Sequence, residues 1–158
     1  MIAAILATAL AASPAACASA QHHQFDFWLG EWNVVDAKTG APAGHSLVES
    51  LYGGCVLREN WREPGFEGGS LNTYSDTDHA WRQTWMDQSG AVRDFTGGWR
   101  DGRMVLVAHA LSRAGKPVLV RMAFTPNPDG TVRQYSDSSA DAGVTWTERY
   151  DYLYRRAR

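Results

Sequence analysis

The fold is indicated most clearly by the stretch VRDFTGGWRDGRMVLVAHAL, residues 92–111. The pair Asp101-Gly102 divides it into two runs rich in apolar, aromatic and β-branched residues, which is the composition of half-buried strands. Asp-Gly between two such runs is the preferred two-residue turn of a β-hairpin, because both of its central positions need a positive φ. The stretch therefore predicts two antiparallel strands joined by a tight turn.

The same arrangement repeats along the rest of the chain. Strand-like runs alternate with turn-forming groups such as Gly53-Gly54, Pro64-Gly65 and Asn127-Pro128-Asp129-Gly130. Ten strands are predicted, at residues 27–36, 46–52, 55–63, 70–75, 81–87, 92–99, 103–111, 118–125, 132–138 and 144–155. A short N-terminal helical turn is expected at residues 23–29. Without crossover helices the sheet is antiparallel and all-β, and a meander of this length is expected to close into a lipocalin-like (calycin) barrel.

Composition limits the class of protein. The chain has 158 residues, the size of one domain, and its seven Trp, six Tyr and five Phe suit strands better than helices. Lys and Arg number 15 against 17 Asp and Glu, so the formal charge is −2, unlike the strongly basic surface of a nucleic-acid-binding protein. We expect a small-molecule partner and no nucleic acid, while the oligomeric state stays open.

Residues 1–20 are typical of a signal peptide. Residues 2–12 form an uncharged apolar run that is too short to span a bilayer, and Ala18-Ser19-Ala20 is a small-x-small cleavage motif. If the chain is cleaved there, the mature domain consists of residues 21–158 and has no membrane span. We expect it in the periplasm or secreted. Lipoprotein anchoring at Cys17 is the alternative that we favour less.

The two cysteines follow from the same interpretation. Cleavage after Ala20 removes Cys17 and leaves Cys55 as the one cysteine of the mature domain. An intramolecular disulfide is then excluded, and Cys55 is expected to be a small buried side chain.

Five segments carry a resemblance to a known family. They are residues 25–32 (FDFWLGEW), 54–61 (GCVLRENW), 69–74 (GSLNTY), 81–87 (WRQTWMD) and 139–146 (SADAGVTW). Together they resemble a bacterial family of secreted domains of unknown function. The resemblance spans nearly all of the predicted mature domain, and it implies a fold rather than a reaction.

Gly30-Glu31-Trp32 is also similar to the Gly-x-Trp signature that opens lipocalins and other calycins. That resemblance implies structural roles for Gly30 and Trp32, with Trp32 closing the floor of the barrel. It also implies an arginine of the last strand across Trp32, for which Arg155 fits best and Arg149 is the alternative.

The opening segment is distantly similar to nitrobindins, which are ten-stranded haem barrels. Nitrobindins hold haem through a histidine in the C-terminal part of the barrel, and this chain has no histidine after His109. No haem is therefore expected. The chain also contains no Gly-x-Ser-x-Gly, His-Glu-x-x-His or P-loop motif, so neither a cofactor nor a metal is predicted.

Residues of alternate parity share one face of a strand, and this rule selects candidates for the barrel interior. Glu59 shares a face with Leu57 and Trp61, because the opposite face carries Arg58 and Arg62. Similar stripes combine aromatic and hydrogen-bonding side chains on other strands, including residues 146, 148, 150, 152 and 154. The predicted ligand-binding residues are Glu59, Trp61, Asn72, Tyr74, Gln83, Trp85 and Arg121. The direction of Arg121 stays open, since its strand could bury Val120 and Met122 instead, and a purely structural Glu59–Arg121 pair is the alternative.

Three functions fit these stripes. A mixture of aromatic walls and polar anchors favours an exported barrel that binds a small, partly apolar ligand. An enzyme with Glu59 as its general acid and base is the second interpretation. A structural or interaction module with a filled barrel is the third. The pattern favours binding over catalysis. No catalytic residue is assigned, except Glu59 if the protein is an enzyme.

Overall fold

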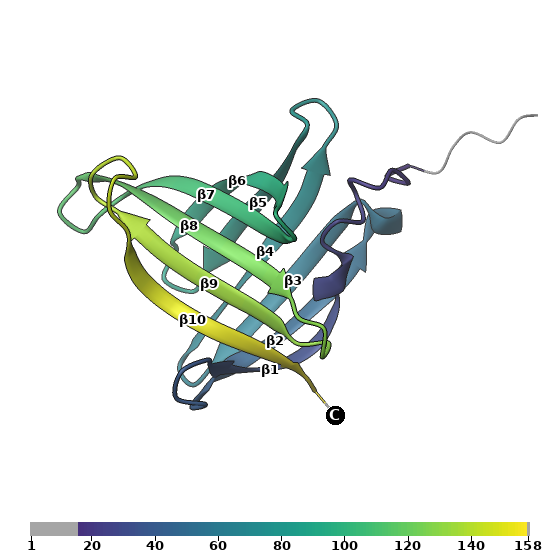
Figure 1. The fold of residues 1–158 in the computed structure, drawn as a ribbon, viewed down its shortest axis with the longest axis horizontal. Coiled ribbons are helices and arrows are strands. Elements are labelled where there is room, and N and C mark those ends of the chain that lie inside the picture. Colours follow the sequence, from purple (N-terminus) through teal and green to yellow (C-terminus); the bar gives the residue numbers. More distant parts are fainter. Residues whose placement is uncertain (1–15, 158) are drawn as a thin grey trace, which may run out of the picture.

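Ten antiparallel strands close into a barrel in the computed structural model of the protein, which describes residues 16–157 (Figure 1). Each strand pairs with its neighbours in sequence, and β1 (Gly30–Asp36) also pairs with β10 (Thr147–Arg156), so the sheet has no free edge. The other strands are β2 (Pro42–Leu51), β3 (Val56–Glu63), β4 (Phe66–Ser75), β5 (Ala80–Asp87), β6 (Val92–Arg100), β7 (Arg103–Leu111), β8 (Pro117–Pro126) and β9 (Val132–Ser139). The predicted all-β, ten-stranded, lipocalin-like barrel is confirmed.

The strand positions differ from the prediction mainly at the starts of β2 and β4. Both strands begin four residues earlier than expected, at Pro42 instead of residue 46 and at Phe66 instead of residue 70. In β4 the added residues include Gly68, which lay outside the predicted strands. A Cβ atom on Gly68 would lie 2.7 Å from a ring carbon of Trp85, so the bare backbone lets this indole of β5 lie against the strand.

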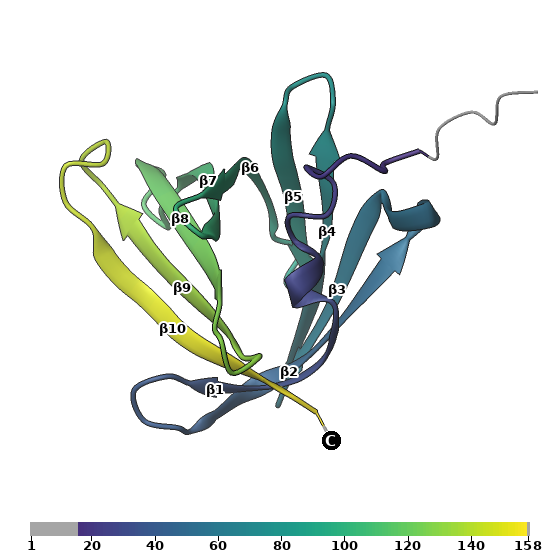
Figure 2. The same ribbon diagram turned by 45° about the vertical axis from the view of Figure 1, so that its right-hand side comes forward.

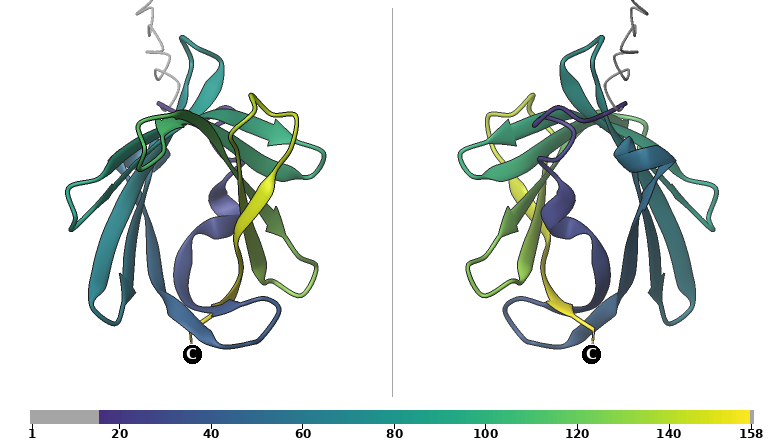
Figure 3. Two further views of the ribbon diagram at one scale, coloured as in Figure 1. Left: turned by 90° about the vertical axis from the view of Figure 1, so that its left-hand side faces the viewer. Right: turned by 90° about the vertical axis from the view of Figure 1, so that its right-hand side faces the viewer.

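One end of the barrel is closed by aromatic rings from the N-terminal segment. The 3₁₀ turn η1 (Asp26–Trp28) lies between the strand walls (Figures 2 and 3). The fully buried ring of Trp28 has its centre 4.9 Å from that of Phe25 and 4.8 Å from that of Phe124. Trp32 in β1 donates a hydrogen bond from Nε1 to the Trp28 carbonyl at 2.8 Å. The helical turn predicted at residues 23–29 is confirmed in a shorter form, and the first strand begins at Gly30 rather than at residue 27.

The arginine that packs across Trp32 is Arg156, which corrects the prediction of Arg155 with Arg149 as the alternative. The guanidinium carbon of Arg156 lies 3.9 Å from the centre of the Trp32 ring. The reason is the register of the β1–β10 pair. Trp32 lies directly opposite Arg156, so the two side chains share a face, whereas Arg155 lies opposite Asn33 and points to the other face.

Gly30 has a conformation that suits its predicted structural role. Its φ of +125° is in a region that side chains other than glycine rarely adopt. A Cβ atom there would also collide with the guanidinium of Arg156, which donates a hydrogen bond to the Leu29 carbonyl. Glycine at this position therefore lets the arginine lie over the Trp32 ring.

Cys17 and Cys55 form a disulfide, which corrects the expectation that Cys55 is buried and unpaired. The bond joins positions 38 residues apart and ties the N-terminal segment to the chain just before β3. The predicted cleavage after Ala20 would remove Cys17, and only that cleavage spoke against the bond. The apolar run predicted at residues 2–12 lies outside the described residues. No helix within residues 16–157 is long and apolar enough to cross a membrane.

Candidate functional site

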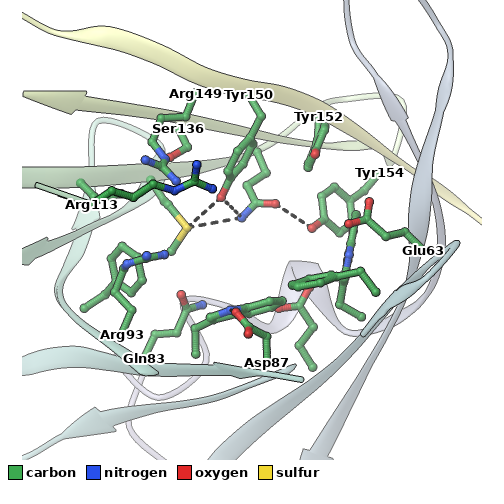
Figure 4. Close-up of a pocket in the computed structure, with 18 residues that line it drawn as sticks. Glu63, Gln83, Asp87, Arg93, Arg113, Ser136, Arg149, Tyr150, Tyr152 and Tyr154 are labelled. Atoms are coloured by element: carbon green, nitrogen blue, oxygen red, sulfur yellow. Dashed lines mark hydrogen bonds between the residues drawn. The ribbon is translucent and has the colours of Figure 1, made fainter. Parts of the chain in front are cut away.

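A cavity of about 540 Å³ occupies the half of the barrel remote from η1 (Figure 4). Its walls come from strands on both sides of the barrel and from the loop between β7 and β8. The side chains that line it are Glu59, Trp61, Glu63, Phe66, Gln83, Trp85, Asp87, Arg93, Phe95, Arg113, Val120, Met122, Gln134, Ser136, Arg149, Tyr150, Tyr152 and Tyr154. Its volume lies in the usual range of about 300–1,000 Å³ for small-molecule sites. The barrel is thus filled in the half nearer η1 and open in the other, which argues against the filled-barrel interpretation.

Glu59 lies on the cavity wall in a buried position that disfavours its charge. The alternation of β3 turns Leu57, Glu59 and Trp61 inward, as predicted, and Glu59 is 5% exposed. Its carboxylate oxygens accept hydrogen bonds from the hydroxyls of Ser46 at 3.0 Å and Ser70 at 3.1 Å. Burial raises the pKa of Glu59 to about 7, and the two serine hydrogen bonds offset only part of that effect. Near neutral pH the carboxyl can therefore donate or accept a proton.

A chain of buried amides continues from Glu59 across β4 and β5. The amide of Asn72 donates to the Ser70 hydroxyl at 3.0 Å and to the Leu57 carbonyl at 3.1 Å. Gln83 in turn donates to Asn72 Oδ1 at 2.6 Å. Asn72 is fully buried and Gln83 lines the cavity. Gln83 is thus available to a ligand, whereas Asn72, which was predicted to bind one, lies outside the lining and supports Gln83 and Ser70.

Tyrosines of β10 form the opposite wall. The ring of Tyr152 stacks on Trp61 with a centre-to-centre distance of 5.8 Å, and on Tyr150 at 4.6 Å. Tyr154 donates a hydrogen bond to Gln134 Oε1 at 2.7 Å, and the amide nitrogen of Gln134 donates to the Tyr150 hydroxyl at 3.2 Å. Burial raises the pKa of Tyr150 and Tyr154 well above the ordinary value, so both phenols stay protonated.

The predicted stripe on this strand is only partly correct. Tyr150, Tyr152 and Tyr154 line the cavity, but Glu148 is exposed and is ion-paired with Lys38. The register of the β9–β10 pair shifts between Glu148 and Tyr150. Such a bulge inserts an extra residue and ends the simple alternation, so Arg149 also lines the cavity.

Arg121 was predicted to line the cavity and instead lies outside it. Its guanidinium donates two hydrogen bonds to Asp137, at 3.0 Å from Nε and 2.6 Å from Nη2, and lies 3.9 Å from the centre of the Trp146 ring. The neighbouring Val120 and Met122 take the inward positions of β8. This corrects both the ligand-binding role of Arg121 and the structural pair with Glu59.

Tyr74, like Asn72 and Arg121, is a predicted residue that does not line the cavity. It lies near the end of β4, where its ring packs at 6.2 Å from Trp81 and at 5.2 Å from His22. Its parity was predicted correctly, since Trp81 is a core residue, but its position along the strand is too close to the closed end. Glu59, Trp61, Gln83 and Trp85 are thus the predicted residues that the structure brings together in the cavity.

Sequence reasoning missed three cavity arginines, Arg93, Arg113 and Arg149, together with Ser136. Arg93 shares its parity with Phe95 on β6, and that pattern could have found it. Arg113 lies in a loop and Arg149 at a bulge, where strand parity carries no information. Ser136 lies within the predicted strand at residues 132–138 but was not selected as a site residue; it belongs to the regular part of β9 opposite Met122.

No protein-family model matches the chain, and no curated protein matches it either. Within residues 16–157, no group of three or more His, Cys, Asp or Glu side chains is arranged to hold a metal ion. Aromatic rings offer flat apolar contacts, Gln83 and Gln134 offer amides, and Glu59 offers a carboxyl close to its midpoint at neutral pH.

Proposed function

We propose that the protein binds a small, partly apolar molecule in the open half of the barrel. The observation that carries this proposal is the cavity of about 540 Å³, walled by Trp61, Trp85, Tyr150 and Tyr152 and lined at intervals by hydrogen-bonding groups. A core meant only to stabilise the fold would be filled with aliphatic side chains, because empty space forfeits packing and buried polar groups cost about 1–3 kcal/mol each when unpaired. Aromatic walls with few polar anchors are the usual form of a ligand site.

The aromatic walls of the cavity favour a ligand with one apolar body. Tyr150, Tyr152 and Trp61 form a continuous stack along one wall, and Trp85 faces the cavity from β5. A flat or extended hydrocarbon portion would pack against these rings. Polar groups of the ligand would meet Gln83 and Glu59 at depth.

An uncharged aromatic probe, N-phenyl-1-naphthylamine, tests the proposal. Saturable binding is expected, with energy transfer from the tryptophans to the probe. Trp85→Ala should weaken binding by about fivefold or more, since it removes a cavity wall. Trp99→Ala is the matched control, because Trp99 is 37% exposed and packs on Phe27 outside the cavity. Absence of saturable binding to the folded wild type, or equal losses in the two variants, would overturn the proposal.

General acid–base catalysis is a second candidate, favoured by the position of Glu59. Its carboxyl lines a ligand-sized cavity and has a pKa of about 7, so both protonation states are populated at neutral pH. Native mass spectrometry of protein from its own host would identify a co-purifying molecule. If the protein is an enzyme, that molecule is chemically changed on incubation, and Glu59→Gln lowers turnover far more than affinity. Unchanged ligand in both proteins would exclude this candidate.

We also propose that the domain is exported to the periplasm or the exterior. The apolar run at residues 2–12 supports export, and so does the Cys17–Cys55 disulfide, because disulfides persist mainly in oxidising compartments. The bond uses the sulfur atom that lipid anchoring at Cys17 would need. Export with the bond intact therefore favours cleavage before Cys17 over the predicted cleavage after Ala20.

A further inference from the structure

Three arginines reach the same side of the cavity from different parts of the chain. Arg93 comes from β6, Arg113 from the β7–β8 loop and Arg149 from the bulge of β10. Figure 4 shows the three side chains on one side of the cavity, with Glu63 across from them. Guanidinium groups gathered in this way repel one another unless an anion lies between them.

These arginines differ from those on the outer face of the same sheet. Arg121 and Arg133 each donate two hydrogen bonds to a buried carboxylate, Asp137 or Asp151. Among residues 16–157, no carboxylate lies within ion-pair distance of Arg93, Arg113 or Arg149. Their donors are therefore open to a molecule in the cavity.

Ser136 supplies an independent observation at the same place. Ser136 is 1% exposed and lines the cavity, and within the described part of the chain its hydroxyl makes no well-aligned hydrogen bond, although it lies close enough to the Tyr150 hydroxyl to lower the pKa of that phenol slightly. Ser136 is paired with Tyr150 across β9 and β10, so it lies beside the bulge that holds Arg149 (Figure 4). A buried hydroxyl without a well-aligned partner is costly, and a ligand oxygen would satisfy it.

On the basis of the proposed binding function, we infer that the ligand carries an anionic group that is held by Arg93, Arg113 and Arg149, with the Ser136 hydroxyl as a further hydrogen-bond donor. The guanidinium fork matches carboxylate, phosphate and sulfonate oxygens, which accept several such hydrogen bonds at once. The apolar body then lies against the tyrosines and tryptophans of the cavity wall. The ligand is thus an amphipathic anion whose charged end faces the mouth of the cavity.

The acidic residues of the cavity fit this orientation. Asp87 accepts hydrogen bonds from the Trp85 indole at 3.0 Å and from the main-chain nitrogen of Ser89 at 2.9 Å, so its oxygens are already engaged. Glu63 lies away from the arginines in Figure 4. Glu59 is deeper, where a protonated carboxyl would not repel the ligand.

Two dyes that differ in one charged group test the inference. 8-Anilinonaphthalene-1-sulfonate is N-phenyl-1-naphthylamine with a sulfonate added, so the pair separates the anionic contribution from the apolar one. At low salt the wild type should bind the sulfonate at least fivefold more tightly than the neutral dye, and added NaCl should reduce this preference. Arg113→Gln and Arg149→Gln should each weaken sulfonate binding by about fivefold to tenfold, with neutral-dye binding unchanged within twofold.

Two further variants keep the result interpretable. Arg155→Gln removes the same charge from the outer face of β10 and should change neither affinity, because Arg155 is exposed and points away from the cavity. Ser136→Ala should weaken sulfonate binding by about threefold without lowering the melting temperature, since its hydroxyl makes no well-aligned hydrogen bond that would be lost. Decanoate and decyl phosphate are then used as competitors of the dye, with decanol as the uncharged comparison. The competitor that displaces the dye best identifies the preferred anionic group.

The possible outcomes separate the two proposals. Binding of the neutral dye without any preference for the sulfonate, or a preference that Arg113→Gln and Arg149→Gln leave intact, overturns the anionic site and leaves the proposed binding function standing. Equal losses in Arg149→Gln and Arg155→Gln also overturn the site, because the effect is then one of overall charge. Failure of both dyes to bind the folded wild type overturns the proposed function itself.

Discussion

Glu59→Gln should remove a pH dependence of stability that the wild type carries. The carboxyl is 5% exposed, and burial raises its pKa from 4.5 to about 7. Below pH 4.5 the group is protonated in the folded and unfolded states, and the folded state keeps its full stability. As pH rises towards 7, the unfolded chain ionises while the folded protein still holds the proton, so the free energy of unfolding falls. Above pH 7 both states are ionised and the loss levels off.

The size of the loss follows from the two pKa values. One pKa unit corresponds to about 1.4 kcal/mol, so moving from 4.5 to about 7 lowers the free energy of unfolding by roughly 3 kcal/mol. Glutamine cannot ionise, and it keeps the shape of the side chain. The serine hydroxyls at 3.0 and 3.1 Å can donate to its oxygen or accept from its nitrogen. The variant should therefore match the wild type near pH 4.5 and exceed it by roughly 3 kcal/mol at pH 8.

Urea unfolding followed by tryptophan fluorescence, repeated at intervals from pH 4.5 to 8.5, measures this difference. With a typical urea dependence of about 1–3 kcal/mol per molar, the midpoints should separate by about 1–3 M at pH 8. Glu63→Gln is the matched control, since it removes a carboxyl from the partly exposed end of the same strand. Parallel curves for wild type and Glu59→Gln across this range would refute the argument from burial.

Three further predictions concern the closed end and the disulfide. Trp32→Ala should lower the free energy of unfolding by about 3–5 kcal/mol in a urea titration, because removal of a fully buried indole leaves a cavity. Arg156→Gln should lower it measurably, since the guanidinium packs on the Trp32 ring, whereas Arg155→Gln should change it by no more than about 0.5 kcal/mol. An unchanged melting temperature in Trp32→Ala would disprove its role at the floor. Under oxidising conditions Cys55→Ser should lower the free energy of unfolding by about 3–4 kcal/mol, which is the loop-closure contribution of a bond that spans 38 residues. Under full reduction the variant and the wild type should be equally stable. Intact mass of exported protein should show an N-terminus before Cys17 and a mass 2 Da below the reduced form; a chain beginning at Gln21 would contradict this.

The sequence allowed the fold to be predicted because the two signals that specify a meander are local. Turn residues mark each strand end, and alternation marks each face. Asp101-Gly102 therefore predicted a hairpin correctly, and the parity of Glu59, Trp61 and Gln83 predicted that their side chains point inward. The failures lie where a side chain's direction depends on pairing with another strand. Arg155 and Arg156 differ by one residue of register with β1, and Arg121 has inward and outward alternatives that only its neighbours in β7 and β9 decide.

Other features of the site depend on departures from regular structure. The bulge beside Tyr150 adds Arg149 to the cavity lining, and the loop between β7 and β8 adds Arg113. Neither departure has a sequence pattern that fixes where its side chain points. The disulfide was missed for another reason, because Cys17 had been assigned to a cleaved segment on the basis of a motif three residues long.

Closure of the sheet by β1 and β10 also decides where the molecule can be attached to something else. Cys17 is held at the chain just before β3, and Ala157 donates a main-chain hydrogen bond to Glu31, so the two ends of the described chain both lie on the side of the closed floor. In Figure 1 they lie to the right, and the β7–β8 and β9–β10 loops lie to the left. A linker, a reporter protein or a solid support joined at the C-terminus of β10 would therefore leave the cavity mouth facing outward, which suits this barrel to use as an immobilised capture reagent.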